Sequence, residues 1–367
     1  MMNCEGREII SEAPQPAGTQ VLVTGGGGFL GRAIVEHLLA AGYAVRSFAR
    51  GDYPELRQRG VTVIRGDLTD PEAVKRACDG CAVVFHNAAK AGVWGDYDSF
   101  YRSNVMGTKN ILAACGHAGV GRLVFTSSAS VVFGDADMEG VDESVPYPSH
   151  PRSPYTATKA EGERHVLTAD SPALRTLSLR PHLIWGPGDT QIIPRILAQA
   201  RAGKIVRVGA GKNIIDTTYI DNVAAAHLLA ADALRDNPRA SGRAYFISNG
   251  EPVNLWDFVN RILAMAGIPP IRRGIPKSVA VLLGAVVEAI HLALKLPGEP
   301  RMTRFLAEEL STSHWFDISA ARRELKYAPQ VSVEEGLRRL QSWLQGQGCT
   351  SILSAPPFRR ESTNRPE

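Results

Sequence analysis

A tyrosine and a lysine, Tyr155 and Lys159, stand four residues apart in this 367-residue chain, and both side chains can move protons. Ser153 and Pro154 precede them and are typical of a helix start, and residues four apart share one face of a helix. A free phenol has a pKa of about 10, which makes it a poor base at neutral pH. A nearby ammonium stabilises the phenolate and brings the phenol closer to the operating pH. The spacing therefore predicts a proton-transfer pair.

A group of hydroxyls at residues 126–130 follows the apolar run 123–125, which predicts a strand. Ser128 lies in this group, twenty-seven residues before Tyr155. A hydroxyl at the end of a parallel strand lies at the crevice where such sheets bind ligands. Tyrosine and lysine also occur at this spacing by chance on helix surfaces. The prediction therefore depends on the serines and on a glycine loop near the start of the chain.

That glycine loop follows the apolar run 21–23 and opens a helical pattern over residues 29–41. In such a loop the first glycine permits a tight turn, the second lets a pyrophosphate approach the backbone, and the third lets helix and strand pack closely. The positive end of the helix receives the negative charge of the phosphates. We therefore expect a dinucleotide at Gly25, Gly28, Phe29, Leu30 and Gly31.

The end of the second predicted strand distinguishes NAD from NADP. An acidic residue about 20 positions after the glycines would bind the ribose hydroxyl of NAD. Here Arg50 occupies that stretch, and the first acid is Asp52. A guanidinium pairs well with a 2′-phosphate, although a solvated surface arginine is the alternative. We expect NADP, with NAD as the second choice.

Two further strand ends complete the expected cofactor site. Asp67 follows the third predicted strand and could accept a hydrogen bond from the adenine amino group, with a turn or helix cap as the alternative. The fourth strand ends in small residues that let a cofactor lie along the sheet edge. The residues expected there are Asp67, Leu68, Asn87, Ala88 and Ala89.

These motifs fall on an alternating pattern of short apolar runs and helix-like segments. The runs at 44–48, 61–64, 83–85, 123–125 and 176–179 are each followed by helical sequence. Such a series predicts an α/β fold with a doubly wound parallel (Rossmann) sheet. We assign residues 19–185 to a dinucleotide-binding domain, with returns to the sheet near 212–250 at Ile214-Ile215 and at 245–247. Residues 186–211 and 251–345 form a smaller, mainly helical substrate lobe.

The two ends and one apolar segment need separate interpretation. Residues 1–18 are expected to be a flexible leader and 346–367 a disordered tail. Residues 279–296 are very apolar, but Glu288, His291 and Lys295 interrupt them, whereas a membrane span needs about 20 apolar residues. We expect a lid helix that touches a greasy substrate or lies on a membrane surface. A plain core helix is an equal alternative.

Composition limits the class of protein. Hydrophobic residues make up 44% and charged residues 21%, and the net charge of +4 has no basic cluster that would indicate nucleic acid binding. Cys78 and Cys81 are interpreted as a buried residue and a turn residue rather than as a redox pair or metal ligands. Without a secretory signal, the expected location is the cytoplasm, with membrane association through 279–296 as an addition and no metal.

The glycine loop, the serines and the Tyr–Lys pair together resemble the extended short-chain dehydrogenases, over residues 19 to 344. The family's T-G-x-x-G-x-x-G and Y-x-x-x-K motifs fall on the loop and the pair. The resemblance implies that Ser128 is catalytic and that Asn104, in N-V-M-G-T, supports the proton relay of the lysine. It puts Pro181 beside the nicotinamide. It also implies a homodimer, formed through helices near 99–117 and 155–168.

Within that family the chain is similar to the 3β-hydroxysteroid and 4α-carboxysterol dehydrogenases, through R-P-H-L-I-W-G-P-G-D and G-K-N-I-I-D-T-T-Y-I-D-N-V. Through N-A-A-K-A-G-V-W-G-D-Y-D-S and L-P-G-E-P it is more similar to the bacterial 2-alkyl-3-oxoalkanoate reductases of olefin synthesis. Both substrates carry an oxygen at the β carbon of an α-branched carboxylic acid. The resemblance implies NADP-dependent reduction of such a small hydrophobic 3-oxo acid.

Alternatives remain at this stage. The substrate could be a 3β-hydroxysteroid, and the same catalytic group serves nucleotide-sugar epimerases and dehydratases. The lobe, rich in Leu, Ile and Val, argues against a sugar. A non-catalytic NADP-sensing protein is a third alternative, and the intact Tyr–Lys pair argues against it. For the substrate carboxylate, Arg195 is one hypothesis, and a solvated helix-face arginine is the other.

Overall fold

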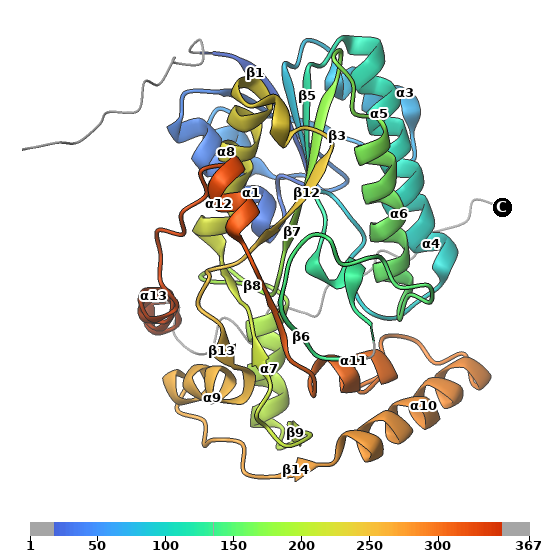
Figure 1. Cartoon of the computed structure of the whole chain (residues 1–367), viewed down its shortest axis with the longest axis vertical. Coiled ribbons are helices and arrows are strands. Elements are labelled where there is room, and N and C mark those ends of the chain that lie inside the picture. Colours follow the sequence, from blue (N-terminus) through green and yellow to red (C-terminus); the bar gives the residue numbers. More distant parts are fainter. Residues whose placement is uncertain (1–17, 135, 347–367) are drawn as a thin grey trace, which may run out of the picture.

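Seven parallel strands form the central sheet of the protein, described for residues 18–134 and 136–346 of a computed structural model (Figure 1). Their order is β12-β7-β5-β4-β1-β2-β3, so the winding reverses between β1 and β4, where such sheets bind ligands. This confirms the doubly wound sheet. The predicted leader up to residue 17 and tail from residue 347 lie outside the described residues. The strands are β1 (Gln20–Thr24), β2 (Ala44–Ala49), β3 (Thr62–Arg65), β4 (Val83–His86), β5 (Arg122–Thr126), β7 (Arg175–Pro181) and β12 (Arg243–Ile247).

Helices cover both faces of this sheet, which explains why strands such as β4 are buried throughout. Figure 1 shows α3, α5 and α6 on one face and α1 and α8 on the other. One long helical segment contains a π-helical turn, η1, between α4 and α5. The helices are α1 (Phe29–Ala40), α2 (Pro54–Gln58), α3 (Pro71–Cys78), α4 (Tyr97–Tyr101), η1 (Arg102–Met106), α5 (Gly107–Ala118), α6 (Pro154–Thr168) and α8 (Ile220–Asp236), with 3₁₀ turns η2 (Ala129–Val132) and η3 (Pro238–Ala240).

A second sheet, in the order β13-β10-β15-β6, belongs to the smaller lobe. Residues 245–247 join the central sheet in β12 as expected, but the prediction that Ile214-Ile215 does so was wrong. This two-residue strand, β10, pairs with β13 and β15 instead, whose residues lie far along the chain. The strands of this sheet are β6 (Met138–Val141), β10 (Ile214–Ile215), β13 (Val253–Asn254) and β15 (His314–Phe316).

Most of the other elements of the lobe lie below the central sheet in Figure 1, whereas α12 (Ser319–Glu324) lies against β12 of that sheet. Two small parallel ladders, β8 with β11 and β9 with β14, connect its loops. The remaining elements are β8 (Ile184–Trp185), β9 (Arg207–Val208), β11 (Thr218–Tyr219), β14 (Gly274–Ile275), α7 (Ile192–Arg201), α9 (Leu255–Met265), α10 (Lys277–Ala293), α11 (Arg304–Glu309), α12 (Ser319–Glu324) and α13 (Val333–Gly346).

Helix α10 packs on α11 through a narrow side of small and polar residues. Ala280, Gly284 and Glu288 are its buried positions. A Cβ at Gly284 would lie 2.7 Å from the backbone of Thr303, so only glycine permits this approach. The Glu288 carboxylate accepts hydrogen bonds at 2.7 Å from the backbone and the Nε of Arg304. The larger apolar side chains point outward, so the core-helix alternative is wrong. No helix in the described part of the chain has the length and apolarity to cross a membrane.

Candidate active site

The first turn of α6 holds the tyrosine and the lysine in place. Ser153 caps this helix, accepting a hydrogen bond from the backbone of Thr156 at 3.2 Å, and the Thr156 hydroxyl completes a capping box. Pro154 begins the helix, where its missing N–H costs nothing. Tyr155 is half-buried and Lys159 only 2% exposed, so both side chains point toward the sheet.

Lys159 lies in an apolar niche at the end of β5. Its ammonium donates to the carbonyl of Thr126 and lies 4.1 Å from the ring centre of Phe125. Burial lowers the pKa of Lys159 to about 7, and the negative charge of Glu163 opposes that shift. The lysine therefore titrates near neutral pH, which suits a group that passes a proton.

The structure brings Tyr155 and Ser128 together. Burial raises the pKa of the Tyr155 phenol, and a hydrogen bond with the Ser128 hydroxyl partly offsets this rise. The Ser128 oxygen in turn bonds to the Ser130 hydroxyl at 2.8 Å and accepts from the Ser130 backbone at 3.2 Å. The phenol therefore holds its proton at neutral pH and can donate it to an oxygen beside Ser128.

Asn104 lies in the π-helical turn η1 and is buried. Its amide donates to the backbone carbonyl of Lys90 at 3.1 Å and to the Thr158 hydroxyl at 3.0 Å. Its carbonyl accepts from the Lys90 backbone at 2.7 Å. Asn104 thus joins the loop after β4 to α6 next to Lys159, which makes it a positioning residue. A π-helical turn often marks such functional places.

His86, the last residue of β4, was missed by sequence reasoning. Its ring nitrogens bond to Thr24 at 2.9 Å and to Thr108 at 3.0 Å. The Thr108 hydroxyl donates to the backbone carbonyl of Asn104 at 2.6 Å, so it accepts from the histidine Nε2–H. The histidine Nδ1 then accepts from the Thr24 hydroxyl. Burial, with a smaller effect of Lys159, lowers the His86 pKa to about 3, which keeps the ring neutral.

The glycine loop fits a dinucleotide pyrophosphate. Gly25 has a φ of +71°, and a Cβ at Gly31 would lie only 2.0 Å from the Gly25 carbonyl oxygen. At the start of α1, Gly28 supplies no side-chain cap and the first turn has no acid, so the amides of Phe29 and Leu30 stay available to an anion.

Arg50 is exposed directly after β2, at the edge where an adenosine ribose would lie. Asp52, the first acid of that stretch, forms an ion pair with Arg57. Tyr53 was missed by sequence reasoning: its ring fills the space beside Gly27, where a Cβ would come within 2.2 Å. The Tyr53 ring therefore packs against both the glycine loop and Gly51, in the segment after β2.

The other expected cofactor residues lie along the same sheet edge. Asp67 accepts from the backbone and hydroxyl of Thr69 at 2.9 and 2.8 Å, which gives it the turn role of the alternative interpretation. Leu68 is buried against Gly107.

The Ala88 amide donates to the Thr24 hydroxyl oxygen at 2.9 Å. Asn87 and Ala89 flank Ala88 in the loop after β4, and Pro181 ends β7.

Two charged residues of the lobe, Glu309 and the predicted Arg195, act electrostatically at the site. Glu309, the last residue of α11, is half-buried, and its charge raises the pKa of Tyr155. Burial raises the pKa of Glu309 to about 7, and Arg195 opposes the shift. Arg195 itself is 47% exposed and pairs with Glu299 at 3.3 Å. No sequence signal indicated Glu309, because it lies far from the motifs in the chain.

The site has a dinucleotide loop, a pair of hydroxyls that can hold an oxygen, and a buried lysine behind the tyrosine. This arrangement defines an NAD(P)-dependent oxidoreductase of the short-chain dehydrogenase type, acting on the CH–OH/C=O pair. Residues 22–275 match the 3-beta hydroxysteroid dehydrogenase/isomerase family, and the chain belongs to that family.

Individual relatives agree with this class. A 2-alkyl-3-oxoalkanoate reductase of Stenotrophomonas maltophilia (strain K279a) is 51% identical over 325 residues, which cover 88% of this chain and 98% of the relative. The sterol-4-alpha-carboxylate 3-dehydrogenase, decarboxylating, of Homo sapiens is 36% identical over 338 residues, 90% of this chain and 89% of that one. The solved structure of MoeE5 in complex with UDP-glucose and NAD has a TM-score of 0.70 and 27% identity, over 89% and 99% of the two chains. A nicotinamide cofactor is therefore supported.

Proposed function

We propose that the protein uses NADPH to reduce the 3-oxo group of 2-alkyl-3-oxoalkanoates. The observation that carries the proposal is the protonated Tyr155 phenol beside Ser128, with Lys159 buried behind it. The relative of Stenotrophomonas maltophilia named for this activity matches over 98% of its length, which supports the same substrate here.

The side chains divide the chemistry between them. When bound by the glycine loop, NADPH would supply the hydride for the β-carbon of the substrate. The Ser128 and Tyr155 hydroxyls donate hydrogen bonds to the carbonyl oxygen, and these bonds strengthen as negative charge develops there. Tyr155 then gives its proton to that oxygen. The Lys159 ammonium stabilises the resulting phenolate, and its pKa near 7 lets it take part in returning the proton.

The substrate test uses purified protein with NADPH and a panel of 3-oxo acids, a 3-oxosteroid and UDP-glucose. We expect kcat/KM to be highest for 2-alkyl-3-oxo acids and to rise with alkyl length, because each buried methylene contributes about 0.8 kcal/mol. Oxidation of 2-alkyl-3-hydroxy acids with NADP⁺ checks the reverse direction. A flat profile from short to long chains, or a preference for UDP-glucose, would overturn the proposal. Higher turnover of the steroid would favour the sterol dehydrogenase alternative, which the 36% identical human relative supports.

The preference for NADPH over NADH is a second part of the proposal. Arg50 is exposed at the end of β2, and the nearby Asp52 is neutralised by Arg57. A 2′-phosphate would therefore meet a cation rather than a free carboxylate. Fluorescence titration should give a lower Kd for NADPH, and Arg50→Ala should narrow the difference. If the wild type binds NADPH and NADH with equal Kd, the proposed preference for NADPH is wrong.

We further propose that Arg195 receives the substrate carboxylate. Its guanidinium is within electrostatic range of Glu309, which in turn acts on Tyr155, so it lies on the substrate side of the site. Arg195→Gln should raise KM at least about tenfold with a smaller effect on kcat, as expected for loss of a charge-assisted hydrogen bond. Arg201→Gln, at the exposed end of the same helix, is the matched control. An unchanged KM for Arg195→Gln would exclude the role.

Finally, we propose that the protein is a homodimer that pairs through α4, α5 and α6. Outside residues 279–296, Tyr97 (45%) and Met106 (43%) are the large apolar side chains of the described part that remain exposed, and both lie on this helical segment. Light scattering should give twice the chain mass, and Met106→Glu should lower it. A monomeric wild-type protein would overturn the proposal.

A further inference from the structure

Helix α10 and the residues after it carry an unusual concentration of exposed apolar side chains. Of the ten large apolar side chains exposed in the described part of the protein, eight lie between residues 279 and 296. On the helix, Leu292 exposes 69% of its surface, and the five residues before it, Val279, Leu282, Leu283, Val286 and Ile290, expose between 41% and 65%. These five residues are called the outward face. Monomeric proteins rarely leave so continuous an apolar surface in water.

The outward face is one stripe, because each of its residues has another member three or four positions away, the spacing of one helix face. The opposite side, Ala280, Gly284 and Glu288, is the side that packs on α11. Helix α10 thus packs on the protein through its small and polar side and exposes its apolar side, whereas an ordinary surface helix buries its apolar side. Figure 1 shows α10 at the rim of the lobe, with α11 between it and the rest of the protein.

Positive charges surround this stripe. Residues 271–304 contain six lysines and arginines and two glutamates. Both glutamates are paired: Glu288 with Arg304 at 2.7 Å, and Glu299 with Arg195 at 3.3 Å. After these two ion pairs are set aside, the remaining charged side chains of residues 271–304 are lysines and arginines.

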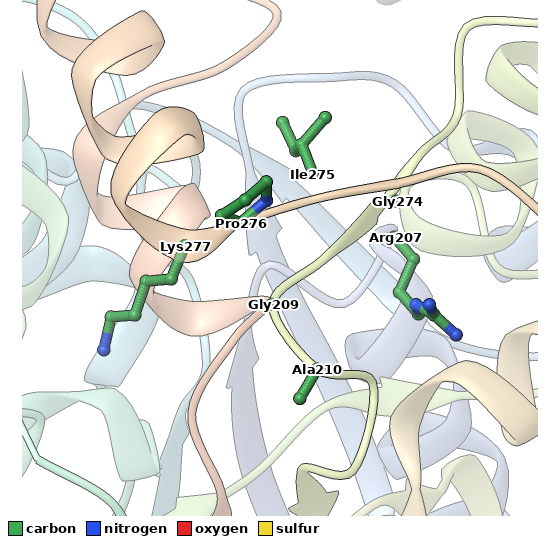
Figure 2. Close-up of a pocket in the computed structure, with 7 residues that line it drawn as sticks. All are labelled: Arg207, Gly209, Ala210, Gly274, Ile275, Pro276 and Lys277. Carbon is green, nitrogen blue, oxygen red and sulfur yellow. The ribbon is translucent and has the colours of Figure 1, made fainter.

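The cations lie at both ends of the helix. Arg272 and Arg273 are exposed before α10, and Lys295 and Arg301 are exposed after it. At the first of these ends, residues of β9, of β14 and of the start of α10 line a pocket, and Figure 2 shows Arg207 and Lys277 among its lining side chains. An apolar stripe flanked by cations matches the boundary between acyl chains and anionic headgroups.

We propose that α10 lies on the surface of an anionic phospholipid bilayer, with its outward face among the acyl chains and the flanking cations at the headgroups. Its 17 residues would cover about 26 Å of surface. A second copy of the chain is a poorer occupant, because a two-fold contact brings the same surface patches of both copies together and with them the same cations. This inference goes beyond the proposed activity and does not depend on it.

The experiment is flotation of the purified full chain with phosphatidylcholine vesicles, with and without phosphatidylglycerol and in the absence of any substrate. The wild type should bind the vesicles that contain phosphatidylglycerol and dissociate with salt. Leu282→Gln/Val286→Gln should reduce the partition coefficient at least about tenfold, since burial of one leucine side chain exceeds that factor. Arg272→Gln/Arg273→Gln should reduce binding to the anionic vesicles and weaken its salt dependence.

The matched control is Arg322→Gln/Arg323→Gln, which removes two exposed positive charges on α12, away from α10, and should leave vesicle binding unchanged. Circular dichroism and NADPH titration verify that each variant is folded. Equal flotation of the wild type and the Leu282/Val286 variant would overturn the proposal. A wild type that does not float with anionic vesicles would also overturn it. If the Leu282/Val286 variant binds vesicles as the wild type does and differs only by a lower mass in light scattering, the outward face contacts a second copy of the chain instead.

Discussion

Arg180 and Glu163 form a buried ion pair directly behind the catalytic turn of α6. Nε and Nη2 of Arg180 donate to Glu163 Oε1 at 3.0 and 2.7 Å, and the two side chains are 4% and 0% exposed. The hydroxyls of Tyr147 and Ser178 donate to the same carboxylate at 2.7 and 2.6 Å. The pair joins α6, one turn beyond Lys159, to β7. The pair therefore anchors α6, and the negative charge of Glu163 raises the pKa of Lys159.

Glu163→Gln should destabilise the protein strongly. The substitution leaves the buried Arg180 guanidinium without its counter-charge, which costs about 3–5 kcal/mol of unfolding free energy. Urea unfolding measures the effect, and the far more exposed pair of Glu335 and Arg338 provides the control. Glu335→Gln should cost far less, because solvent screens the charges of the exposed pair. Similar losses in both variants would mean that the buried pair does not anchor α6.

Tyr155→Phe keeps the ring and removes the proton donor. We expect a loss in kcat of at least about 10²-fold, the usual scale for general acid catalysis, with NADPH binding nearly unchanged. Steady-state kinetics and fluorescence titration separate the two effects. Tyr97→Phe, at an exposed tyrosine, should behave as wild type. Turnover of Tyr155→Phe at the wild-type rate would remove this tyrosine from the mechanism.

Cofactor affinity should depend on pH through Lys159. Burial lowers its pKa to about 7, so the ammonium is present below that pH and lost above it. The anionic NADPH binds more tightly when Lys159 carries its positive charge. The Kd for NADPH should therefore rise about tenfold from pH 6.5 to pH 8.5. Lys159→Met should bind NADPH more weakly at pH 6.5 and show a smaller change with pH. The exposed Lys204→Met is the control. Parallel pH curves for wild type and Lys159→Met would contradict the assignment.

Asp216 should make the protein less stable as the pH rises. It is fully buried, and its carboxylate accepts from the Phe316 backbone at 2.9 Å. Burial raises its pKa from 3.8 to about 6, so the folded state holds this proton more tightly than the unfolded state. The contribution of the carboxyl to stability is complete below about pH 4 and is lost through pH 6.

Asp216→Asn removes this titration and retains a carbonyl acceptor for Phe316. Relative to wild type, its unfolding free energy should therefore increase by about 3 kcal/mol between pH 4 and pH 8. Urea unfolding at several pH values measures the difference. The exposed Asp257→Asn should leave the pH dependence unchanged. If the difference in unfolding free energy between Asp216→Asn and wild type does not change with pH, the pKa of Asp216 is not raised in the folded protein.

The glycine loop and the Tyr–Lys pair could be predicted because their determinants are local. A tight turn with Gly25 and Gly31 lies within a few residues of β1, and the spacing of Tyr155 and Lys159 places both on one face of α6. The alternation of apolar runs with helical segments was likewise enough for the parallel sheet. Ile214-Ile215 was misplaced because two residues carry no periodicity, and its partners β13 and β15 are distant in sequence.

By itself, then, the sequence determined the cofactor fold, the proton-transfer pair and the existence of an apolar helix near residue 280, since strand and helix periods are properties of neighbouring residues. The tertiary structure decided which side of α10 faces outward, because that depends on the approach of Gly284 to α11. It also decided that His86 stays neutral and that Glu309 lies opposite Tyr155. Burial and the charges of sequence-distant neighbours set these properties, and neither can be obtained from the spacing of residues along the chain.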